Sequence, residues 1–203
     1  MKKKMLELIW EINSELRSCI EMINWEWTEL DQLEKDENWH AAKALLLGTW
    51  KKYPHDLKVT LRLVFFCWYL IIEDGPVNVK NMDLEELQTV LDEVTLFGLT
   101  NYNTDPAYLW CFGYMMSLFP YYFGDDFEML EEKGKSMLKQ VYTKVPNDPV
   151  YKYSYLACIS KKVSSEVTLQ LQAILEDRFK GEGLLSSYFK SIWGNPHELA
   201  NEI

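Results

Sequence analysis

The chain has 203 residues, of which 48% are hydrophobic and 26% charged, and its formal net charge at pH 7 is −10. This amount of apolar material excludes an intrinsically disordered chain, because it can bury enough surface to offset the entropy lost on folding. Only seven prolines and nine glycines occur, and neither residue type precedes Gly48, so the sequence favours helices over the turn-rich pattern of a β protein.

The first predicted element is a long amphipathic helix over residues 5–35. Apolar side chains recur there at helical spacing: Leu6, Ile9, Leu16, Ile20, Ile23, Trp27 and Leu30. This spacing places them on one face of a helix, and the pattern leaves open a break near Asn24. Three lysines at positions 2–4 imitate the start of a secretion signal, but Glu7 and Glu11 interrupt the apolar stretch that such a signal needs. We therefore expect a protein that is not exported and is cytoplasmic.

A short motif marks the beginnings of later helices. Lys52-Tyr53-Pro54-His55-Asp56 and Lys144-Val145-Pro146-Asn147-Asp148 share the pattern Lys-x-Pro-x-Asp, and Asn103-Thr104-Asp105-Pro106 lies near their midpoint. In each segment the Asp carboxylate can accept hydrogen bonds from the backbone N–H groups of the first helical turn. Each of these starts introduces an aromatic-rich apolar helix, so each is expected to open a buried helix.

These starts divide the chain into helical hairpins. Asp83 with Glu86, and Asp125 with Glu128, resemble capping boxes with Asp in place of Ser or Thr. The expected helices are 39–51, 57–72, 83–97, 108–119, 126–145, 150–159, 165–179 and 184–193. They pair into hairpins over 38–73, 82–123, 125–162 and 164–194, all within a single domain of residues 1–203. The predicted fold class is therefore all-α, an irregular α-solenoid of antiparallel helical hairpins that is similar to tetratricopeptide architecture and leaves a concave surface free for ligands.

The negative charge is concentrated in the middle of the chain. Residues 63–132 carry thirteen acidic side chains and one basic one, Lys80, whereas residues 133–190 carry ten basic and five acidic side chains. Carboxylates repel the phosphates of nucleic acid, so we expect no nucleic-acid ligand. A basic protein partner fits the charge better, and the alternative is that acidic helix faces only keep the chain soluble.

Two apolar stretches, 63–72 and 108–123, are either too short or too interrupted to cross a bilayer, so we expect buried helices and no membrane partner. The cysteines lie in separate apolar stretches and predict buried, reduced thiols. They are Cys19, Cys67, Cys111 and Cys158.

Motifs that carry catalysis or hold metals are missing from the sequence. Only three histidines occur, and Glu37-Asn38-Trp39-His40 is a single Glu-x-x-His where a di-iron bundle needs two. No glycine-rich phosphate loop, nucleophile elbow or zincin motif is present. We expect a protein that is not an enzyme and that has neither a metal nor another cofactor.

The helical hairpins, the Lys-x-Pro-x-Asp starts and the ending Leu184-Leu185-Ser186-Ser187-Tyr188-Phe189 together resemble the helical immunity proteins of bacterial contact-dependent growth inhibition and related polymorphic toxin systems. This resemblance is one of architecture and covers most of the chain. It implies that the partner is the C-terminal toxin domain of a cognate effector, commonly a basic RNase such as an EndoU-type nuclease, and that the immunity protein covers its active site.

The expected docking face combines carboxylates with the tyrosines of a turn that follows Pro120. Its residues are Asp83, Glu85, Glu86, Glu93, Tyr121, Tyr122, Asp125, Asp126, Glu128, Glu131 and Glu132. Carboxylates can imitate a phosphate backbone in a cationic cleft, and exposed tyrosines are frequent binding hot spots. Two alternatives stay open: a tetratricopeptide-like chaperone or adaptor that holds a peptide in its concave groove, and a helical metal-dependent enzyme.

Overall fold

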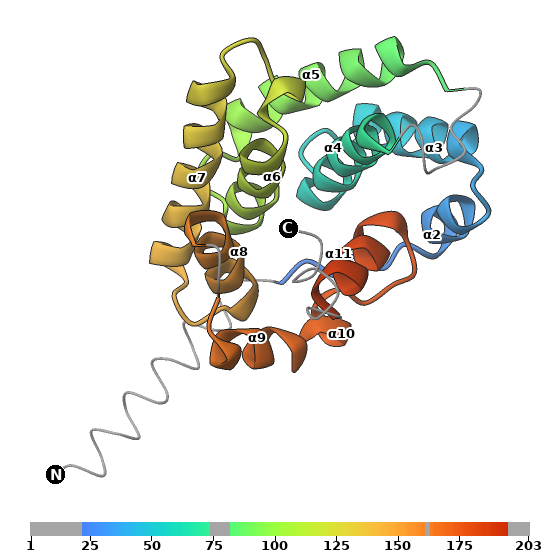
Figure 1. The fold of residues 1–203 in the computed structure, drawn as a ribbon. Coiled ribbons are helices and arrows are strands. Elements are labelled where there is room, and N and C mark those ends of the chain that lie inside the picture. Colours follow the sequence, from blue (N-terminus) through green and yellow to red (C-terminus); the bar gives the residue numbers. More distant parts are fainter. Residues whose placement is uncertain (1–21, 74–81, 161–162, 195–203) are drawn as a thin grey trace, which may run out of the picture.

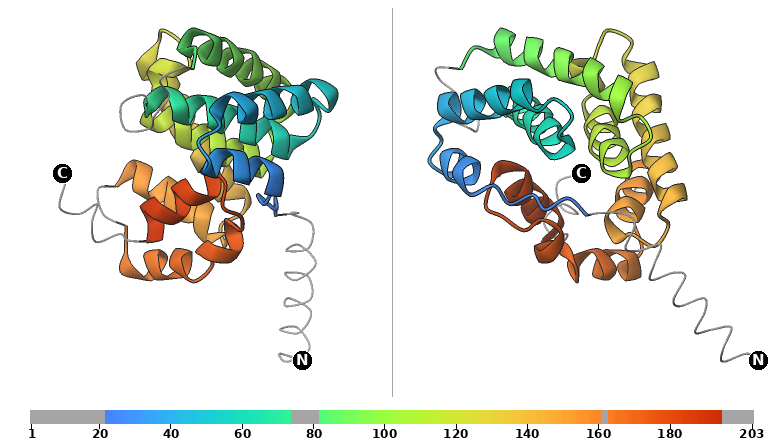
Figure 2. Two further views of the ribbon diagram at one scale, coloured as in Figure 1. Left: turned by 90° about the vertical axis from the view of Figure 1, so that its right-hand side faces the viewer. Right: turned by 180° about the vertical axis from the view of Figure 1, so that it is seen from behind.

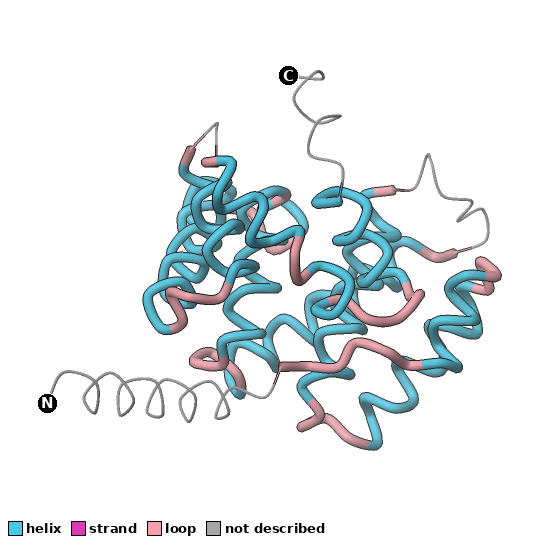
Figure 3. Tube along the Cα trace, turned by 90° about the horizontal axis from the view of Figure 1, so that it is seen from below, coloured by secondary structure: helices cyan, strands magenta, loops and turns pink. Residues whose placement is uncertain are grey.

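The structure is a computed structural model that describes residues 22–73, 82–160 and 163–194. Within these ranges it contains only helices and the loops that connect them (Figures 1 and 3). The helices are α2 (Thr28–Lys35), α3 (Trp39–Lys52), α4 (Leu57–Ile72), α5 (Leu84–Asn101), α6 (Pro106–Leu118), the short 3₁₀ helix η1 (Pro120–Tyr122), α7 (Phe127–Lys144), α8 (Pro149–Ile159), α9 (Ser165–Gln172), α10 (Leu175–Arg178) and α11 (Leu184–Gly194). The all-α prediction is confirmed for the described residues.

The helix starts predicted from the repeated motif are confirmed. Asp56 accepts from the backbone N–H of Val59, and Asp105 and Asp148 each accept from two backbone N–H groups in the first turn of the following helix. These bonds satisfy donors that the helix itself leaves without partners. The predicted cap Asp83 also accepts from the N–H of Glu86.

The cap of α7 is one residue later than the sequence predicted. Asp126 accepts from the backbone N–H of Met129 at 3.1 Å, so it is Asp126 rather than Asp125 that begins the helix. The carboxylate of Asp125 is exposed and precedes the helix. The carboxylate of Asp125 therefore caps no helix.

The N-terminal helix predicted over 5–35 is not continuous: residues 28–35 are helical, the break left open near Asn24 is present, and the part before residue 22 lies outside the described residues. Residues 22–27 are not helical, and α2 begins only at Thr28. Trp25 is buried against Trp110, with 6.3 Å between ring centroids. The backbone N–H of Trp27 donates to Asp31, at a distance of 3.1 Å. These contacts hold the segment in a non-helical conformation despite its helical periodicity.

The predicted helix over 165–179 is also interrupted, because α9 ends at Gln172 and α10 begins at Leu175. The two short helices turn the chain toward α11, which contacts both α2 and α4 (Figure 1). The last helix therefore returns to the first hairpin, and the described helices follow a ring-like course (Figure 2). A strict stack of repeats would contact only neighbours along the chain.

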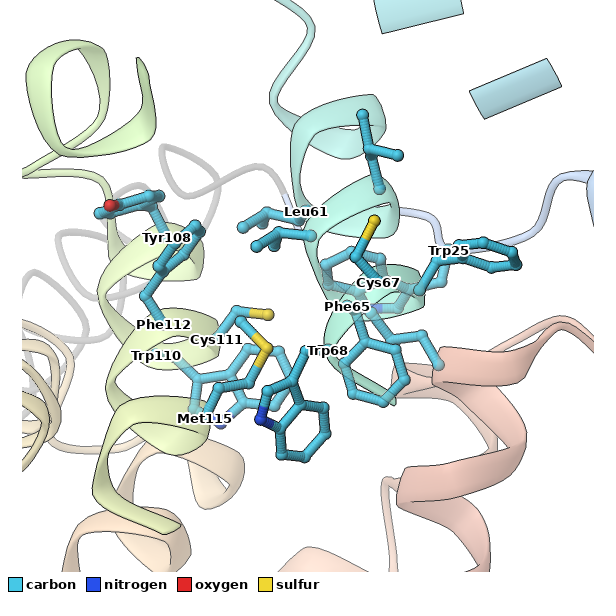
Figure 4. Packing of buried hydrophobic residues seen from close by; sticks show 14 of the residues in the cluster. Trp25, Leu61, Phe65, Cys67, Trp68, Tyr108, Trp110, Cys111, Phe112 and Met115 are labelled. Carbon is cyan, nitrogen blue, oxygen red and sulfur yellow. The ribbon is translucent and has the colours of Figure 1, made fainter. Parts of the chain in front are cut away.

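Aromatic side chains fill the inside of this course. Trp110 of α6 lies 4.9 Å from Phe189 and 6.4 Å from Trp193 of α11, measured between ring centroids. Between α4 and α6, Trp68 and Met115 pack in the same core (Figure 4). Rings of α4, α6 and α11 thus meet in tilted and edge-to-face contacts inside this course.

A buried ionic cluster joins the N-terminal segment, α2 and α4. Arg62 is 1% exposed and donates to Asp31 at 2.9 Å, to Glu34 at 2.7 Å and to the carbonyl oxygen of Trp25 at 2.7 Å. Glu34 also accepts from the backbone N–H of Leu184 at 2.6 Å, which connects the cluster to the start of α11. Two carboxylates share one guanidinium here. Burial of the Glu34 carboxylate disfavours its charged form and raises its pKa above the usual value, although Arg62 acts in the opposite direction.

Helices α6 and α7 cross at a pair of glycines. A Cβ atom at Gly134 would lie 2.6 Å from the backbone nitrogen of Ser117 and 2.9 Å from the carbonyl oxygen of Gly113. A side chain at Gly134 would therefore overlap with the backbone of α6. This close approach positions the loop between the two helices, which includes η1.

Candidate acidic docking surface

The structure places the predicted docking residues in three segments: the cap and body of α5, the η1 turn, and the residues just before and in the first half of α7. The side-chain amide of Gln88 in α5 donates to the carbonyl oxygen of Tyr122 at 2.9 Å. The rings of Tyr121 and Phe127 meet edge to face at 6.3 Å and connect η1 to α7. The loop between α6 and α7 accordingly lies beside α5 (Figures 1 and 2).

Three of the predicted carboxylates form ion pairs with two lysines of the same chain. Glu86 forms an ion pair with Lys43 of α3. Glu131 and Glu132 both bind Lys135, at 2.6 and 2.7 Å, and these hydrogen bonds raise the pKa of the lysine. The anionic face is therefore smaller than the one predicted from the sequence.

Six predicted carboxylates have no ion pair with any residue in the described part of the chain: Asp83, Glu85, Glu93, Asp125, Asp126 and Glu128. Asp83 and Asp126 use one oxygen each as a helix cap. The other four are exposed and their charge faces solvent. Of these four, Asp125 and Glu128 flank the start of α7.

We call the segment at the start of α7 the acidic corner, and it comprises Tyr121, Asp125, Asp126, Phe127, Glu128 and Met129. The turn before it closes when the N–H of Phe123 donates to the carbonyl oxygen of Pro120 at 2.9 Å. Gly124 then adopts a φ of +146°, a conformation that L side chains rarely adopt, and this redirects the chain into α7. The negative charges also face the positive end of the α7 dipole, which stabilises them there.

Large apolar side chains are exposed at this corner. Tyr121 is 49% exposed, Phe127 is 51% exposed and Met129 is 57% exposed. Phe127 and Met129 were not part of the sequence prediction. Met129 does not belong to the buried face of α7, which includes Leu130 and Val141. The helical periodicity of the sequence could therefore have predicted that Met129 is exposed. Phe127 lies three residues before Leu130 and therefore on the same face of α7. It is exposed because it is the first residue of the helix, where the packing against α6 ends.

The cysteines and the possible metal ligands are the other candidate functional groups in the described chain. Burial raises the pKa of the Cys67 thiol to about 12 and that of Cys111 further, so neither forms a thiolate near neutral pH. Cys158 is half-buried, and Cys19 lies outside the described residues. No group of three potential metal ligands occurs among the described side chains. The predicted Glu-x-x-His segment straddles a helix start, because Asn38 caps α3.

Two cavities lie on the seam between α2 and the turn before α11. They measure about 380 and 230 Å³ and share Glu182 in their walls. Charged and polar side chains make up most of their walls.

No protein-family model, no curated protein and no solved structure matches this chain. No helix in the described ranges has both the length and the apolar character needed to cross a bilayer. Inferences about function therefore depend on the charge, the exposed side chains and the packing of this chain.

Proposed function

We propose that this protein is a cytoplasmic immunity protein that binds and neutralises a basic nuclease toxin, possessing neither catalytic activity nor a cofactor. The acidic corner is the observation that carries this proposal. It combines three exposed apolar side chains with carboxylates that have no ion pair among the described residues. The proposed partner is an RNase, with an EndoU-type nuclease as the example, and binding would cover its active site.

Physical chemistry supports this pairing in two ways. Unpaired carboxylates attract a cationic surface over a distance of about 10 Å at moderate salt and so increase the rate of encounter. Exposed aromatic and methionine side chains supply the apolar contacts that protein interfaces are enriched in. A surface that only kept the chain soluble would need the charges but not the apolar side chains.

Reversing the charge of the corner is expected to slow association with the toxin. For the double variant Asp125→Lys and Glu128→Lys we expect an association rate constant about 10-fold or more below that of the wild type, with most of the difference lost at high salt. The probe is the C-terminal domain of the protein encoded by the gene immediately upstream, and surface plasmon resonance measures the rate.

The matched control is Glu166→Lys with Asp177→Lys, which changes the net charge equally but on α9 and α10. This control should associate at a rate within about 2-fold of the wild type. Equal slowing in both double variants would mean that net charge alone steers the encounter, and the acidic corner would be rejected as the docking surface.

The second proposal is a tetratricopeptide-like solenoid that acts as a chaperone or adaptor and binds a peptide. The packing of α3 on α4, of α4 on α5, of α6 on α7 and of α7 on α8 favours it, since each of these helices lies against a neighbour in the chain. The filled aromatic interior opposes it. Weak binding to several unfolded segments would support a chaperone, whereas strong binding to one folded toxin domain would support an immunity protein.

A further inference from the structure

The exposed rings of the acidic corner form a connected group. Tyr121 lies 6.3 Å from Phe127, at an interplanar angle of 86°, and 5.9 Å from the half-buried Phe119, at 90°. These edge-to-face contacts hold the rings in fixed relative orientations. About half of Tyr121 and of Phe127 stays open to solvent. The fold thus keeps two aromatic rings exposed next to each other although burying them would be favourable.

Carboxylates flank these rings along the chain. Asp125 precedes the helix, Phe127 is its first residue, and Glu128 follows directly. Neither carboxylate forms an ion pair within the described part of the chain. Negative charges and aromatic rings are therefore presented together within residues 121–128. A cationic group bound here would meet both kinds of side chain at once.

The chemistry of such a surface selects one cation among the protein side chains. A guanidinium group is planar, so it can stack on an aromatic ring and still donate two parallel hydrogen bonds to a carboxylate. An ammonium group is more strongly hydrated and offers a point charge without a plane. Attraction to carboxylates alone does not distinguish strongly between the two cations, whereas aromatic rings favour arginine.

We infer that the acidic corner is a docking surface for arginine side chains of a basic protein partner, with Tyr121 and Phe127 as the stacking platform and Asp125 and Glu128 as the hydrogen-bond acceptors. This inference rests on the proposed function, because it specifies the chemistry of the partner at the same surface. It goes beyond a general preference for positive charge, since it separates two side chains of equal charge.

Hexa-arginine and hexa-lysine peptides test the inference without any toxin. They carry the same side-chain charge, so the difference in their affinities isolates the contribution of the guanidinium plane. At low ionic strength we expect the wild type to bind hexa-arginine about 2- to 5-fold more tightly than hexa-lysine, measured by isothermal titration calorimetry. In the variant Tyr121→Leu with Phe127→Leu, which keeps apolar bulk, the two affinities should become equal.

Tyr53→Leu serves as the matched control. Tyr53 is 53% exposed and Lys52 lies over its ring at 5.0 Å, but it belongs to the end of α3. The control should keep the preference for arginine. Equal affinities of the wild type for the two peptides, a preference that survives in the double variant, or a preference lost equally in the control would each overturn the inference.

Failure of this inference is separable from failure of the proposed function. If the upstream toxin domain binds the wild type and the Tyr121→Leu with Phe127→Leu variant equally well, the toxin is recognised but not through arginine stacking. If hexa-arginine is preferred and the toxin domain does not bind, the surface has the inferred chemistry and the immunity function is rejected.

Discussion

Replacing Arg62 with methionine is expected to lower the free energy of unfolding by about 3 to 5 kcal/mol, because it leaves buried carboxylates without their cation. The guanidinium holds Asp31, Glu34 and the carbonyl oxygen of Trp25 together. Methionine has similar length and no charge, so the loss reports the missing ion pairs rather than a cavity. Chemical denaturation followed by circular dichroism measures it.

Glu34→Gln is the matched variant, and the expected result is the opposite. A glutamine oxygen can still accept from Arg62 and from the backbone N–H of Leu184, while the cluster loses its excess negative charge. We expect stability at neutral pH that is equal to or above that of the wild type. A loss as large as that of Arg62→Met would contradict this account, since it would mean that Arg62 needs both negative charges.

The pH dependence of the same variant checks the sign. Burial raises the pKa of Glu34 above the model-compound value of 4.5, so the folded state holds this proton more tightly than the unfolded state does. The ionised carboxylate therefore costs stability at neutral pH, and this cost disappears as the pH falls through the folded pKa toward 4.5. The advantage of Glu34→Gln over the wild type should shrink over that interval.

Gly134→Ala is the second substitution with a large expected effect. Its Cβ atom would lie 2.6 Å from the backbone nitrogen of Ser117, and a helix backbone cannot move as a flexible side chain can. We expect a loss of about 2 to 3 kcal/mol in the free energy of unfolding, the upper part of the range for overpacked cores. Thermal and urea denaturation measure it.

Gly48→Ala is the control for helix propensity. Gly48 lies in α3, and no atom is within 4 Å of a Cβ built there. Alanine at this position should stabilise the protein by about 0.5 to 1 kcal/mol, because glycine is the poorer helix former. A similar gain in Gly134→Ala would show that α6 and α7 do not pack as closely as the structure has them.

Local signals made the helices predictable. Asp56, Asp105 and Asp148 each bond to N–H groups two or three residues away, so the sequence contains both partners of the interaction. The boundaries of α4 were predicted as observed for the same reason. Helix caps and apolar periodicity act over a few residues, and they determined the all-α class and most helix limits.

The candidate docking surface was predictable only in part. Counting charges along the chain located the acidic region, but Lys43 neutralises Glu86 from 43 residues away. The exposure of Phe127 likewise depends on where the packing of α6 against α7 ends. Charge composition therefore indicated a region, and the fold selected the acidic corner within it.

Residue pattern alone predicts that this chain is helical, where most helices begin, and that its middle third is acidic. Long-range packing was needed to show that residues 22–27 are not helical, that α11 returns to α2 and α4, and which carboxylates stay unpaired. The difference lies in the range of the interactions. Caps and periodicity join neighbours in the chain, whereas the burial of Trp25 and the cluster around Arg62 join residues that meet only after the chain has folded.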